Sequence, residues 1–413
     1  MITAQAIKFC SICTYPNSKP LSETEFNYKK GKNKKFIDFN HKNNICAACN
    51  LAEEQKKIDW KSREKELLKL LDKYRAKKGS SEYDCIVPGS GGKDSVYTSH
   101  ILKYKYGMNP LTVTFAPHLY TDWGRKNFYA WLESGFDNLL ETPNIKTMKL
   151  LTRLSFENIL HPFQPFMMGQ MLFPPKIAAK LEIPLIFYGE NPVNYGNNKK
   201  EDLSNKKIEK FTSKNKNIYM AGLNRKKLND LGLTNFDLEV CTPMSLDTAV
   251  KKKINVQYLG YYLNWHPQSN YYYAAENCGF LPAPERSPGS YSKYSSIDDK
   301  LDDIHYYTTY IKFGMGRATY DTAQEIRSGD LTRDEAIKLI KKYDGEYPKR
   351  FEEEVFQYLS INKNDYTKAF NYLKKPIMTR RSFDEIINRF RPKSIWKIEK
   401  YTKKYKLKNT IYS

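Results

Sequence analysis

The residues best suited to chemistry follow an apolar run, Cys85–Pro88, that predicts the end of a buried strand. Residues 90–95 read Ser-Gly-Gly-Lys-Asp-Ser, and the amphipathic stretch Val96–Leu102 after them predicts a helix. Glycines let the backbone approach an anion closely, and the free N–H groups at the start of a helix hold phosphate oxygens. The sequence therefore predicts a nucleotide-binding turn. An ordinary glycine-rich turn without a ligand is the alternative.

This turn is not the common P-loop, which needs Gly, four residues and then Gly-Lys-Ser/Thr. It resembles instead the PP-loop of the ATP pyrophosphatases, in which the turn grips the pyrophosphate end of ATP. The resemblance implies transfer of AMP to a carbonyl or carboxyl oxygen. A nitrogen or sulfur nucleophile then displaces the AMP.

Cysteine spacing predicts a metal site near the N-terminus. Seven cysteines occur, and four of them form two Cys-x-x-Cys pairs, Cys10 with Cys13 and Cys46 with Cys49. Two such pairs complete a tetrahedral shell of four thiolates, which leaves no position for a substrate. We therefore predict a zinc ribbon that holds structural Zn²⁺. A redox pair is the alternative, but no βαβ pattern surrounds these cysteines.

Composition bounds the class of protein. The chain has 413 residues and a net charge of +22, from 68 basic and 46 acidic residues. No secretory signal and no apolar run long enough to span a membrane are visible in the sequence. We therefore expect a globular cytoplasmic protein with no membrane partner. Disulfides are not expected in that compartment.

Positive charge is concentrated at the C-terminus, where residues 374–413 contain 13 Lys or Arg and 3 Asp or Glu. Such charge suggests nucleic acid or a membrane as a partner. No recognition motif accompanies it, so we expect a solvated surface and no nucleic-acid partner. A basic face that attracts anionic small molecules, such as ATP and an acidic or nucleotide-linked sugar, is a third interpretation.

Strands and helices alternate from Tyr83 onward. This pattern predicts an α/β fold with a doubly wound parallel sheet and ligands at the carboxyl ends of the strands. The expected strands are 85–88, 111–115, 138–142, 184–188 and 258–263. The expected helices are 95–106, 126–135, 144–160, 168–181 and 223–250.

Four parts of the chain differ in character. They are a zinc-ribbon module at 1–55, a linking helix at 56–82, a nucleotide-binding domain at 83–296 and a mostly helical C-terminal region at 297–413. A polar stretch at about 194–217 predicts an insertion, and the Pro-, Gly- and Ser-rich residues 282–296 predict a loop. A helix with a glycine-rich end is expected at 298–316.

Taken together, the motifs resemble those of the N-acetyl sugar amidotransferases, the family that includes PseA and WbpG. The resemblance runs over most of the chain and implies a PP-loop (HUP-like) domain. It rests on both cysteine pairs and on four further segments, namely Pro88–Ser95, Gly189–Pro192, Lys312–Thr319 and Glu325–Gly329.

The resemblance also implies a reaction. Members are thought to convert a sugar N-acetyl group to an acetamidino group during synthesis of pseudaminic acid, legionaminic acid or O-antigen sugars. Transfer of AMP to the amide oxygen gives an imidoyl adenylate, and ammonia then attacks the carbon. Ammonia is expected from separate partners similar to HisH and HisF, the glutaminase and cyclase of histidine biosynthesis. No glutaminase signature is visible in this chain, which fits that arrangement.

Residue roles are carried over by matching the turn. Lys93 is expected to neutralise phosphates, with a solvent-facing lysine as the alternative. Asp94 is expected to bind Mg²⁺ or to cap the helix. The residues expected around the phosphates are Pro88, Gly89, Ser90, Gly91, Gly92, Lys93, Asp94 and Ser95.

Other segments supply further candidates. Phe115 and Ala116 are expected near adenine. Glu190 and Asn191, after Gly189, are expected to contact Mg²⁺ or substrate, with a plain turn as the alternative. In a separate motif, two cationic residues, Lys312 and Arg317, flank Gly314 and Gly316. We expect a loop there that closes on pyrophosphate, with a basic surface loop as the alternative.

Two further groups receive structural interpretations. An acidic cluster could bind Mg²⁺, but we expect it to be a solvated helix start. It comprises Asp298, Asp299, Asp302, Asp303 and His305. Trp265 and Tyr271–Tyr273 could stack on a sugar or base, but core packing is expected.

Two other functions compete with sugar amidotransfer. The first is a PP-loop enzyme that modifies tRNA by thiolation or lysidine formation, which the basic charge supports. The second is a zinc-ribbon scaffold that senses a nucleotide without turnover.

Overall fold

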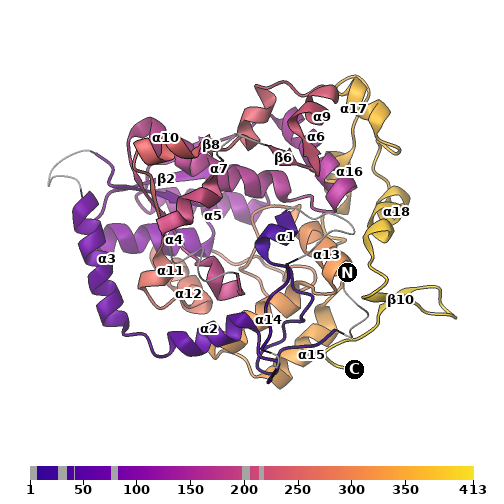
Figure 1. Ribbon diagram of the computed structural model, residues 1–413, viewed down its shortest axis with the longest axis horizontal. Coiled ribbons are helices and arrows are strands. Elements are labelled where there is room, and N and C mark those ends of the chain that lie inside the picture. The colour runs from indigo at the N-terminus through magenta and orange to yellow at the C-terminus, as the bar shows by residue number, and fades with distance from the viewer. Residues whose placement is uncertain (1–6, 27–34, 41, 76–81, 198–204, 214–217) are drawn as a thin grey trace.

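The structure is a computed structural model that describes residues 7–26, 35–40, 42–75, 82–197, 205–213 and 218–413 (Figure 1). The predicted insertion at 194–217 therefore lies partly outside the described residues. Helices in the described part of the chain are all too short or too polar to span a lipid bilayer.

A parallel sheet of five strands forms the centre of the fold, in the order β3-β2-β1-β4-β9. Every pairing in it is parallel. The chain builds outward from β1 in one direction and then in the other, so the switch point lies beside β1. The strands are β1 (Cys85–Pro88), β2 (Pro110–Phe115), β3 (Asn138–Glu141), β4 (Leu185–Tyr188) and β9 (Asn255–Tyr258). The predicted α/β class and parallel sheet are confirmed.

Both faces of the sheet are buried. Successive side chains of a strand point to opposite faces of the sheet, and the side chains on each face are apolar. Ile86 and Val113 face α7 (Gln164–Leu181) and α10 (Leu246–Lys251) in one cluster. Val87 and Phe187 face the opposite side in another. That side is covered by α3 (Trp60–Tyr74), the π-helical turn η1 (Ile101–Lys105) and α11 (Leu259–Tyr262).

Three helices pack together beside the glycine turn at residues 90–95. They are α4 (Lys93–His100), α5 (Asp122–Glu133) and α12 (Pro267–Cys278). Val96, Trp131 and Ala274 form their shared core. Trp131 also donates from Nε1 to Ser99 Oγ at 2.8 Å, so its one polar group is satisfied.

The N-terminal part contains two short helices and several isolated bridges. The helices are α1 (Ser22–Phe26) and α2 (Ala47–Gln55). Antiparallel bridges join Phe9 with Pro16, Pro20 with Phe36, and Phe39 with Cys46, and this pattern is compatible with the predicted ribbon. The next helix, α3, occupies the predicted linking segment and packs on the sheet through Leu67 and Leu71.

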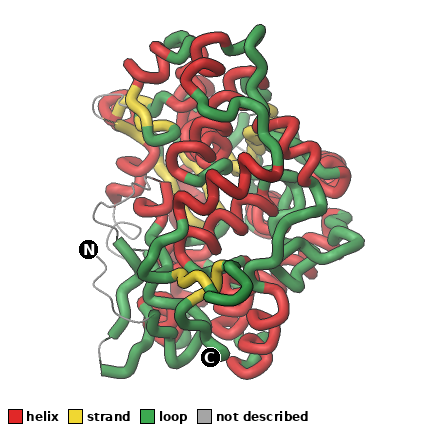
Figure 2. Tube along the Cα trace, turned by 90° about the vertical axis from the view of Figure 1, so that its right-hand side faces the viewer, coloured by secondary structure: helices red, strands yellow, loops and turns green. Residues whose placement is uncertain are grey.

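The C-terminal region is mostly helical, as predicted, and ends in a hairpin. It packs against α6 (Ile145–Ile159) in one core cluster that also contains Phe115. Its elements are α13 (Asp302–Phe313), α14 (Arg317–Ser328), α15 (Arg333–Tyr343), α16 (Glu352–Leu359), α17 (Thr367–Tyr372), α18 (Arg380–Phe390), β10 (Trp396–Ile398) and β11 (Tyr405–Leu407). Figure 1 places its last elements, from α16 to β10, on the side of the molecule opposite α3, and Figure 2 shows helices and loops surrounding the few strands.

Two predicted elements were wrong. The last strand of the sheet is β9, and the expected strand 258–263 is instead the helix α11, whose Gly260 N–H donates to Gly189 O. The expected helix 223–250 is broken into short pieces, because Asn224 and Ser245 cap new helices and Gly232 has a φ of +102°. The pieces are β7 (Leu223–Asn224), α9 (Arg225–Asp230), η4 (Asp237–Cys241), β8 (Met244–Ser245) and α10.

Packing of α18 on α6 should stabilise the whole chain. The Phe383 ring stacks on Phe156 with centroids 5.1 Å apart, and both side chains are fully buried. We predict that Phe383→Ala lowers the free energy of unfolding by about 3–5 kcal/mol, measured by urea denaturation. Tyr401→Ala, at a site that is 96% exposed, is the control and should change it little. Equal stability of the two variants would contradict this packing.

Candidate functional site

The turn after β1 presents the start of a helix at the switch point. Gly92 is the N-cap of α4, and no described side chain caps that end. Ser95 Oγ donates to Gly92 O at 2.9 Å, which closes the turn. Backbone N–H groups at an uncapped helix start are the usual donors to phosphate. The strand, turn and helix therefore have the arrangement that the sequence predicts.

Two glycines in and beside the turn are required, because neighbouring atoms leave no room for a Cβ. Gly91 has a φ of +85°, and a Cβ there would lie 2.7 Å from the Phe128 backbone. A Cβ on Gly89 would lie 2.2 Å from Ser95 Cβ. These glycines hold α4 close to β1 and α5, whether or not a ligand is bound.

Charged side chains at the turn are paired or half-buried. Lys93 is only 7% exposed and forms an ion pair with Asp94, so the solvent-facing alternative for Lys93 is wrong. Because Gly92 is the N-cap, Asp94 does not cap the helix. Asn270 Nδ2 lies 3.4 Å from Asp94 Oδ1, which brings α12 to the site.

The segment around Asp298 is joined by backbone hydrogen bonds to the loop after β2. Thr121 N donates to Asp298 O at 3.1 Å, and Lys300 N donates to Leu119 O at 2.8 Å. A Cβ on Gly124 would lie 2.6 Å from the Asp298 backbone, so the two chains touch. This contact brings the Asp298 carboxylate to the Ser90 hydroxyl, which donates to it.

The acidic cluster is buried, so the predicted solvated helix start was wrong. Asp299 accepts from His118 N at 2.6 Å and from Leu301 N at 2.9 Å. Asp303 accepts from the Arg350 guanidinium at 2.9 and 3.1 Å. These two carboxylates therefore have structural partners.

Of the other two carboxylates, Asp298 lies beside Ser90 of the turn, and Asp302 lies near Asp298, Ser296 and Arg317. Burial raises the pKa of Asp298, and the hydrogen bond from Ser90 opposes that shift. Burial also raises the pKa of Asp302 well above its usual range, against the nearby charge of Arg317. A divalent cation beside them would lower both values, because it favours the ionised carboxylates. We identify Asp298 and Asp302 as Mg²⁺ candidates that the sequence interpretation set aside.

Glu190 follows β4 and lies near the same turn. Its carboxylate accepts a hydrogen bond from the Tyr195 hydroxyl. Burial and then the charge of Asp94 raise the pKa of Glu190 to about 7, while Lys93, Tyr195 and Arg317 oppose the shift. Glu190 is thus positioned to take up or release a proton near neutral pH.

The neighbours of Glu190 have structural contacts. Asn191 is buried, and its side chain accepts from Val193 N at 3.2 Å at the start of the short helix η2 (Pro192–Tyr195). A Cβ on Gly189 would lie 2.6 Å from the Trp265 ring. Asn191 therefore has the turn-forming role that the alternative interpretation gave it.

The expected mobile loop around Gly314 and Gly316 is a packed helix–helix turn. Lys312 belongs to α13 and is 1% exposed, and Arg317 begins α14 and is 6% exposed. Gly314 ends α13 with a φ of +69°, and a Cβ on Gly316 would lie 2.6 Å from the Asp344 carboxylate. Neither a closing loop nor a basic surface loop describes this segment.

Arg317 nevertheless reaches the site. Its Nε lies 2.9 Å from Asp321 Oδ1, its Nη1 donates to Ser296 Oγ at 2.9 Å, and its guanidinium lies 3.9 Å from the centre of the Tyr306 ring. Burial opposes the charge, but Asp321 raises the pKa of Arg317 above its usual range. Arg317 is thus a fixed cation beside Asp302.

A cavity of about 140 Å³ lies at the carboxyl ends of β1, β2 and β4. Phe115, Phe173 and Tyr188 supply aromatic surface, and Gln170 supplies an amide. The Tyr188 hydroxyl is buried without a hydrogen-bond partner among the described residues. The cavity also borders Gly89, so it adjoins the turn at residues 90–95. Its position is compatible with the expected place of adenine near Phe115.

A larger cavity of about 300 Å³, which we call the acceptor pocket, lies on the other side of Glu190. Three tyrosines and several groups that can form hydrogen bonds line it, a composition that suits a polar ligand such as a sugar. Burial and the charges of Lys312 and Arg317 lower the pKa of His305 to about 3, so its imidazole is neutral. The lining includes Lys19, Glu25, Glu190, Tyr195, Tyr306 and Tyr320.

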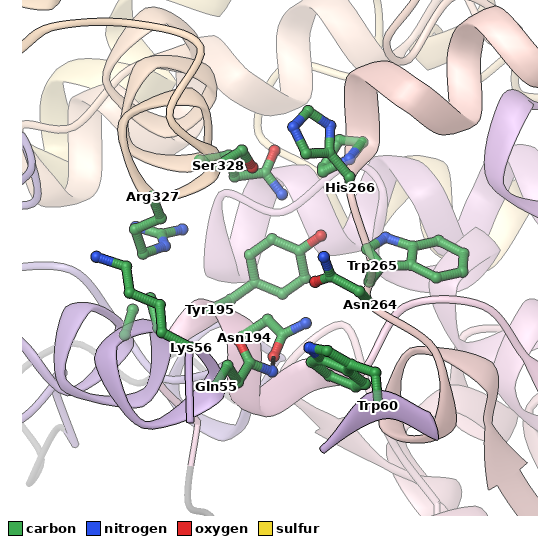
Figure 3. Close-up of a pocket in the computed structure, with 14 residues that line it drawn as sticks. Gln55, Lys56, Trp60, Asn194, Tyr195, Asn264, Trp265, His266, Arg327 and Ser328 are labelled. Atoms are coloured by element: carbon green, nitrogen blue, oxygen red, sulfur yellow. Dashed lines mark hydrogen bonds between the residues drawn. The ribbon is translucent and has the colours of Figure 1, made fainter. Parts of the chain in front are cut away.

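A third cavity of about 250 Å³ lies between the N-terminal part, η2 and α14. Figure 3 shows the Tyr195 ring at its centre, with Arg327 and Lys56 on one side and Trp265 on the other. Tyr195 also lines the acceptor pocket, so one side chain borders both cavities. Trp265 packs edge-on against Tyr97 at 5.5 Å between ring centres, which agrees with the expected packing role.

All four cysteines of the two pairs converge. Cys10 Sγ lies 3.8 Å from Cys49 Sγ, and Cys13 Sγ lies 3.7 Å from Cys46 Sγ. A Zn–S bond of about 2.3 Å in a tetrahedron places sulfur atoms about 3.8 Å apart. The four thiols are at most 1% exposed, and the charge of Arg327 lies close to them. The geometry thus fits a closed four-thiolate metal site.

Residues 288–410 match the family model described as LPS biosynthesis protein WbpG-like, C-terminal domain. This segment supplies Asp298, Asp302 and Arg317, so the resemblance to WbpG-like proteins is confirmed for the part of the chain that completes the site. An uncharacterized protein of Methanocaldococcus jannaschii is 35% identical to this chain over 104 residues. That match spans 25% of this chain and 31% of the relative's length.

The raised pKa of Glu190 should make the free energy of unfolding depend on pH, which denaturation measurements can detect. Its pKa rises from 4.5 to about 7 on folding, so the folded state binds more protons between these values. The Glu190 carboxyl therefore contributes its full stabilisation of the folded state below about pH 4.5, and this contribution is lost as the pH rises through 7. We predict that Glu190→Gln gains stability relative to the wild type over this range, by at most about 3 kcal/mol.

Urea denaturation of both proteins between pH 4.5 and 8 provides the measurement. Glu53→Gln, which removes an exposed carboxylate paired with Lys56 on the surface, is the control and should change the stability little. Parallel stability curves for Glu190→Gln and the wild type would show that Glu190 has no raised pKa.

Proposed function

We propose that this protein is an ATP-dependent amidotransferase that converts the N-acetyl group of a sugar to an acetamidino group through an adenylated intermediate. One observation carries the proposal. Asp298 lies beside Ser90, just before the uncapped start of α4, with Asp302 near it, and both carboxylates come from the segment that matches WbpG-like proteins. The family description names LPS biosynthesis, which supports an acceptor from bacterial surface-sugar synthesis.

An amide needs activation before ammonia can replace its oxygen, because its carbon is a poor electrophile and its oxygen a poor leaving group. In the proposed reaction the amide oxygen attacks the α-phosphorus of ATP, and the bond to pyrophosphate breaks. Ammonia then attacks the imidoyl carbon, the bond from carbon to AMP breaks, and one proton leaves the nitrogen. The products are the acetamidino sugar, AMP and pyrophosphate.

The residues at the turn have distinct roles in this scheme. Backbone N–H groups at residues 90–95 and the Lys93 ammonium bind the β- and γ-phosphates. Asp298 and Asp302 would hold Mg²⁺, with Asp94 as the third candidate carboxylate, and the bound ion would supply positive charge against the phosphates. Fixed groups of this kind need no reorganisation during the reaction.

Three groups act on the acceptor side. Glu190 lies between the turn and the acceptor pocket, and a pKa of about 7 suits it to accept the proton released by the attacking ammonia. Arg317, held by Asp321, adds a positive charge where the pyrophosphate develops. The tyrosines of the acceptor pocket surround the sugar and exclude water, which would otherwise regenerate the amide.

Partners and the cysteine site complete the proposal. Ammonia comes from separate glutaminase and cyclase proteins similar to HisH and HisF, and the reaction takes place in the cytoplasm, where ATP is available. The four cysteines bind structural Zn²⁺, because their sulfur spacing suits that ion and their burial leaves no room for a substrate.

Asp298 allows the first test. We predict that the wild type, given ATP, Mg²⁺, ammonium and an acetamido sugar, releases AMP and forms a product in which NH replaces oxygen. Asp298→Asn should lower kcat by about 10²-fold or more, because one ligand of the proposed ion is weakened. Mass spectrometry of the sugar and separation of the nucleotides provide the readout. Asp72→Asn, on the exposed face of α3, is the matched control.

Release of ADP in place of AMP would exclude adenylation. Retention of tRNA at physiological salt with a steep salt dependence, together with no turnover of sugars, would favour the tRNA-modifying alternative. The positive charge of residues 374–413 is the sequence feature that supports the tRNA-modifying alternative.

Cys46 allows the second test. We predict that Cys46→Ser loses one equivalent of zinc per chain and unfolds at a lower temperature, because a structural ion contributes its binding free energy to folding. Metal analysis and thermal denaturation measure the two effects. Cys278→Ser, a buried thiol outside the cluster, is the control and should keep its zinc. Full zinc retention in Cys46→Ser would refute the four-ligand assignment.

A further inference from the structure

A second group of metal-ligating side chains lies beside the acceptor pocket. Glu25 of α1, His161 after α6 and His305 of α13 offer ligand atoms that all lie within 4.8 Å of one another. His305 Nε2 is 3.8 Å from Glu25 Oε1. Three separate parts of the chain therefore bring two imidazoles and a carboxylate to one point.

Both imidazoles have ring nitrogens without hydrogen-bond partners among the described residues. His161 is fully buried, and neither its Nδ1 nor its Nε2 has a partner. His305 is 7% exposed, and its Nδ1 has none. A buried polar atom left unpaired destabilises the folded state. The protein retains several such atoms in one place, which points to a ligand that uses their lone pairs.

The two rings stack nearly parallel, so at least one of them must rotate for both to direct a nitrogen lone pair at the same ion. Their centroids are 4.9 Å apart and their planes differ by 19°. Burial lowers the pKa of His161 well below its usual range, so its imidazole is neutral, as is that of His305. Neutral imidazole is the form that binds a metal ion.

We propose that Glu25, His161 and His305 bind a divalent transition-metal ion of the zinc class. Two imidazole nitrogens and one carboxylate form the ligand set of zinc sites that keep an open position. Ligand atoms around tetrahedral zinc lie about 3.3 Å apart, so the side chains need to move together by about half an ångström or more. This site is distinct from the four-cysteine cluster, which is closed.

The open position faces the acceptor pocket, because Glu25 and His305 line that cavity and His161 lies behind them. Lys312 lies close enough to act on the charge of both imidazoles. A divalent ion and the Glu25 carboxylate together leave a net positive charge. An anionic oxygen donor, carboxylate or phosphate, would therefore complete the coordination and offset that charge.

Metal content of the full-length protein tests the proposal. The chain is stripped of metal, loaded with Zn²⁺, freed of excess ion and analysed for bound zinc. We expect two equivalents per chain for the wild type. Glu25→Gln and His161→Gln should each bind one, and Cys46→Ser should keep the one held by the imidazoles. His100→Gln, a histidine hydrogen-bonded to Tyr273 away from both clusters, is the control and should bind two.

Loading with Co²⁺ separates the two sites without any activity assay. The cysteine site should give intense thiolate-to-cobalt bands, and the imidazole site should give only weak visible bands that disappear in Glu25→Gln. Glu25 is partly exposed, so that variant should fold even if His161→Gln does not. A wild type that binds one zinc and loses it in Cys46→Ser would overturn the proposal. Retention of two zinc ions by Glu25→Gln and His161→Gln would also overturn it.

Discussion

The backbone pairing between residues 118–121 and 298–300 determines the rest of the site. It is short, but it joins the loop after β2 to a segment about two hundred residues later in the chain. The Asp299 carboxylate strengthens it by accepting from His118 N and Leu301 N. Because this contact positions Asp298 at Ser90, the turn at residues 90–95 and the C-terminal region form a single candidate site. Without it, the start of α4 would be a bare anion-binding turn of no particular specificity.

Charge burial around that contact is costly and needs a functional explanation. Asp298, Asp302 and Glu190 all have raised pKa values, because burial disfavours their ionised forms. Lys93 and Arg317 offset part of this cost but are themselves buried. A divalent cation would pair with the carboxylates, and the phosphates bound to it would pair with Lys93 and Arg317. The free protein therefore has a site whose electrostatics favour a charged ligand, as expected where stability is given up for function.

Local patterns predicted much of this fold correctly. The strand Cys85–Pro88, the glycine turn and the parallel sheet follow from apolar runs and turn residues close together in the sequence. The convergence of the two cysteine pairs also follows from their spacing. The adenine role of Phe115 and the catalytic roles of Lys93 and Glu190 remain predictions, although the structure places these residues around one turn.

Long-range contacts explain what the sequence could not predict. Asp298 and Asp302 read as a solvated helix start, because the loop that covers them lies far away in the chain. Their spacing of four residues gives no helical signal, because Asp298 lies before α13, which begins at Asp302. Gly314 and Gly316 suggested mobility, whereas one ends a helix with positive φ and the other makes room for Asp344.

A crystal structure with Mg²⁺ and an ATP analogue that carries a methylene bridge between the α- and β-phosphorus tests the central claim most directly. The account predicts phosphate oxygens on the N–H groups of residues 90–95, Mg²⁺ between them and Asp298 with Asp302, and adenine in the cavity beside Phe115. A nucleotide bound elsewhere, with the turn at residues 90–95 free of phosphate, would contradict it.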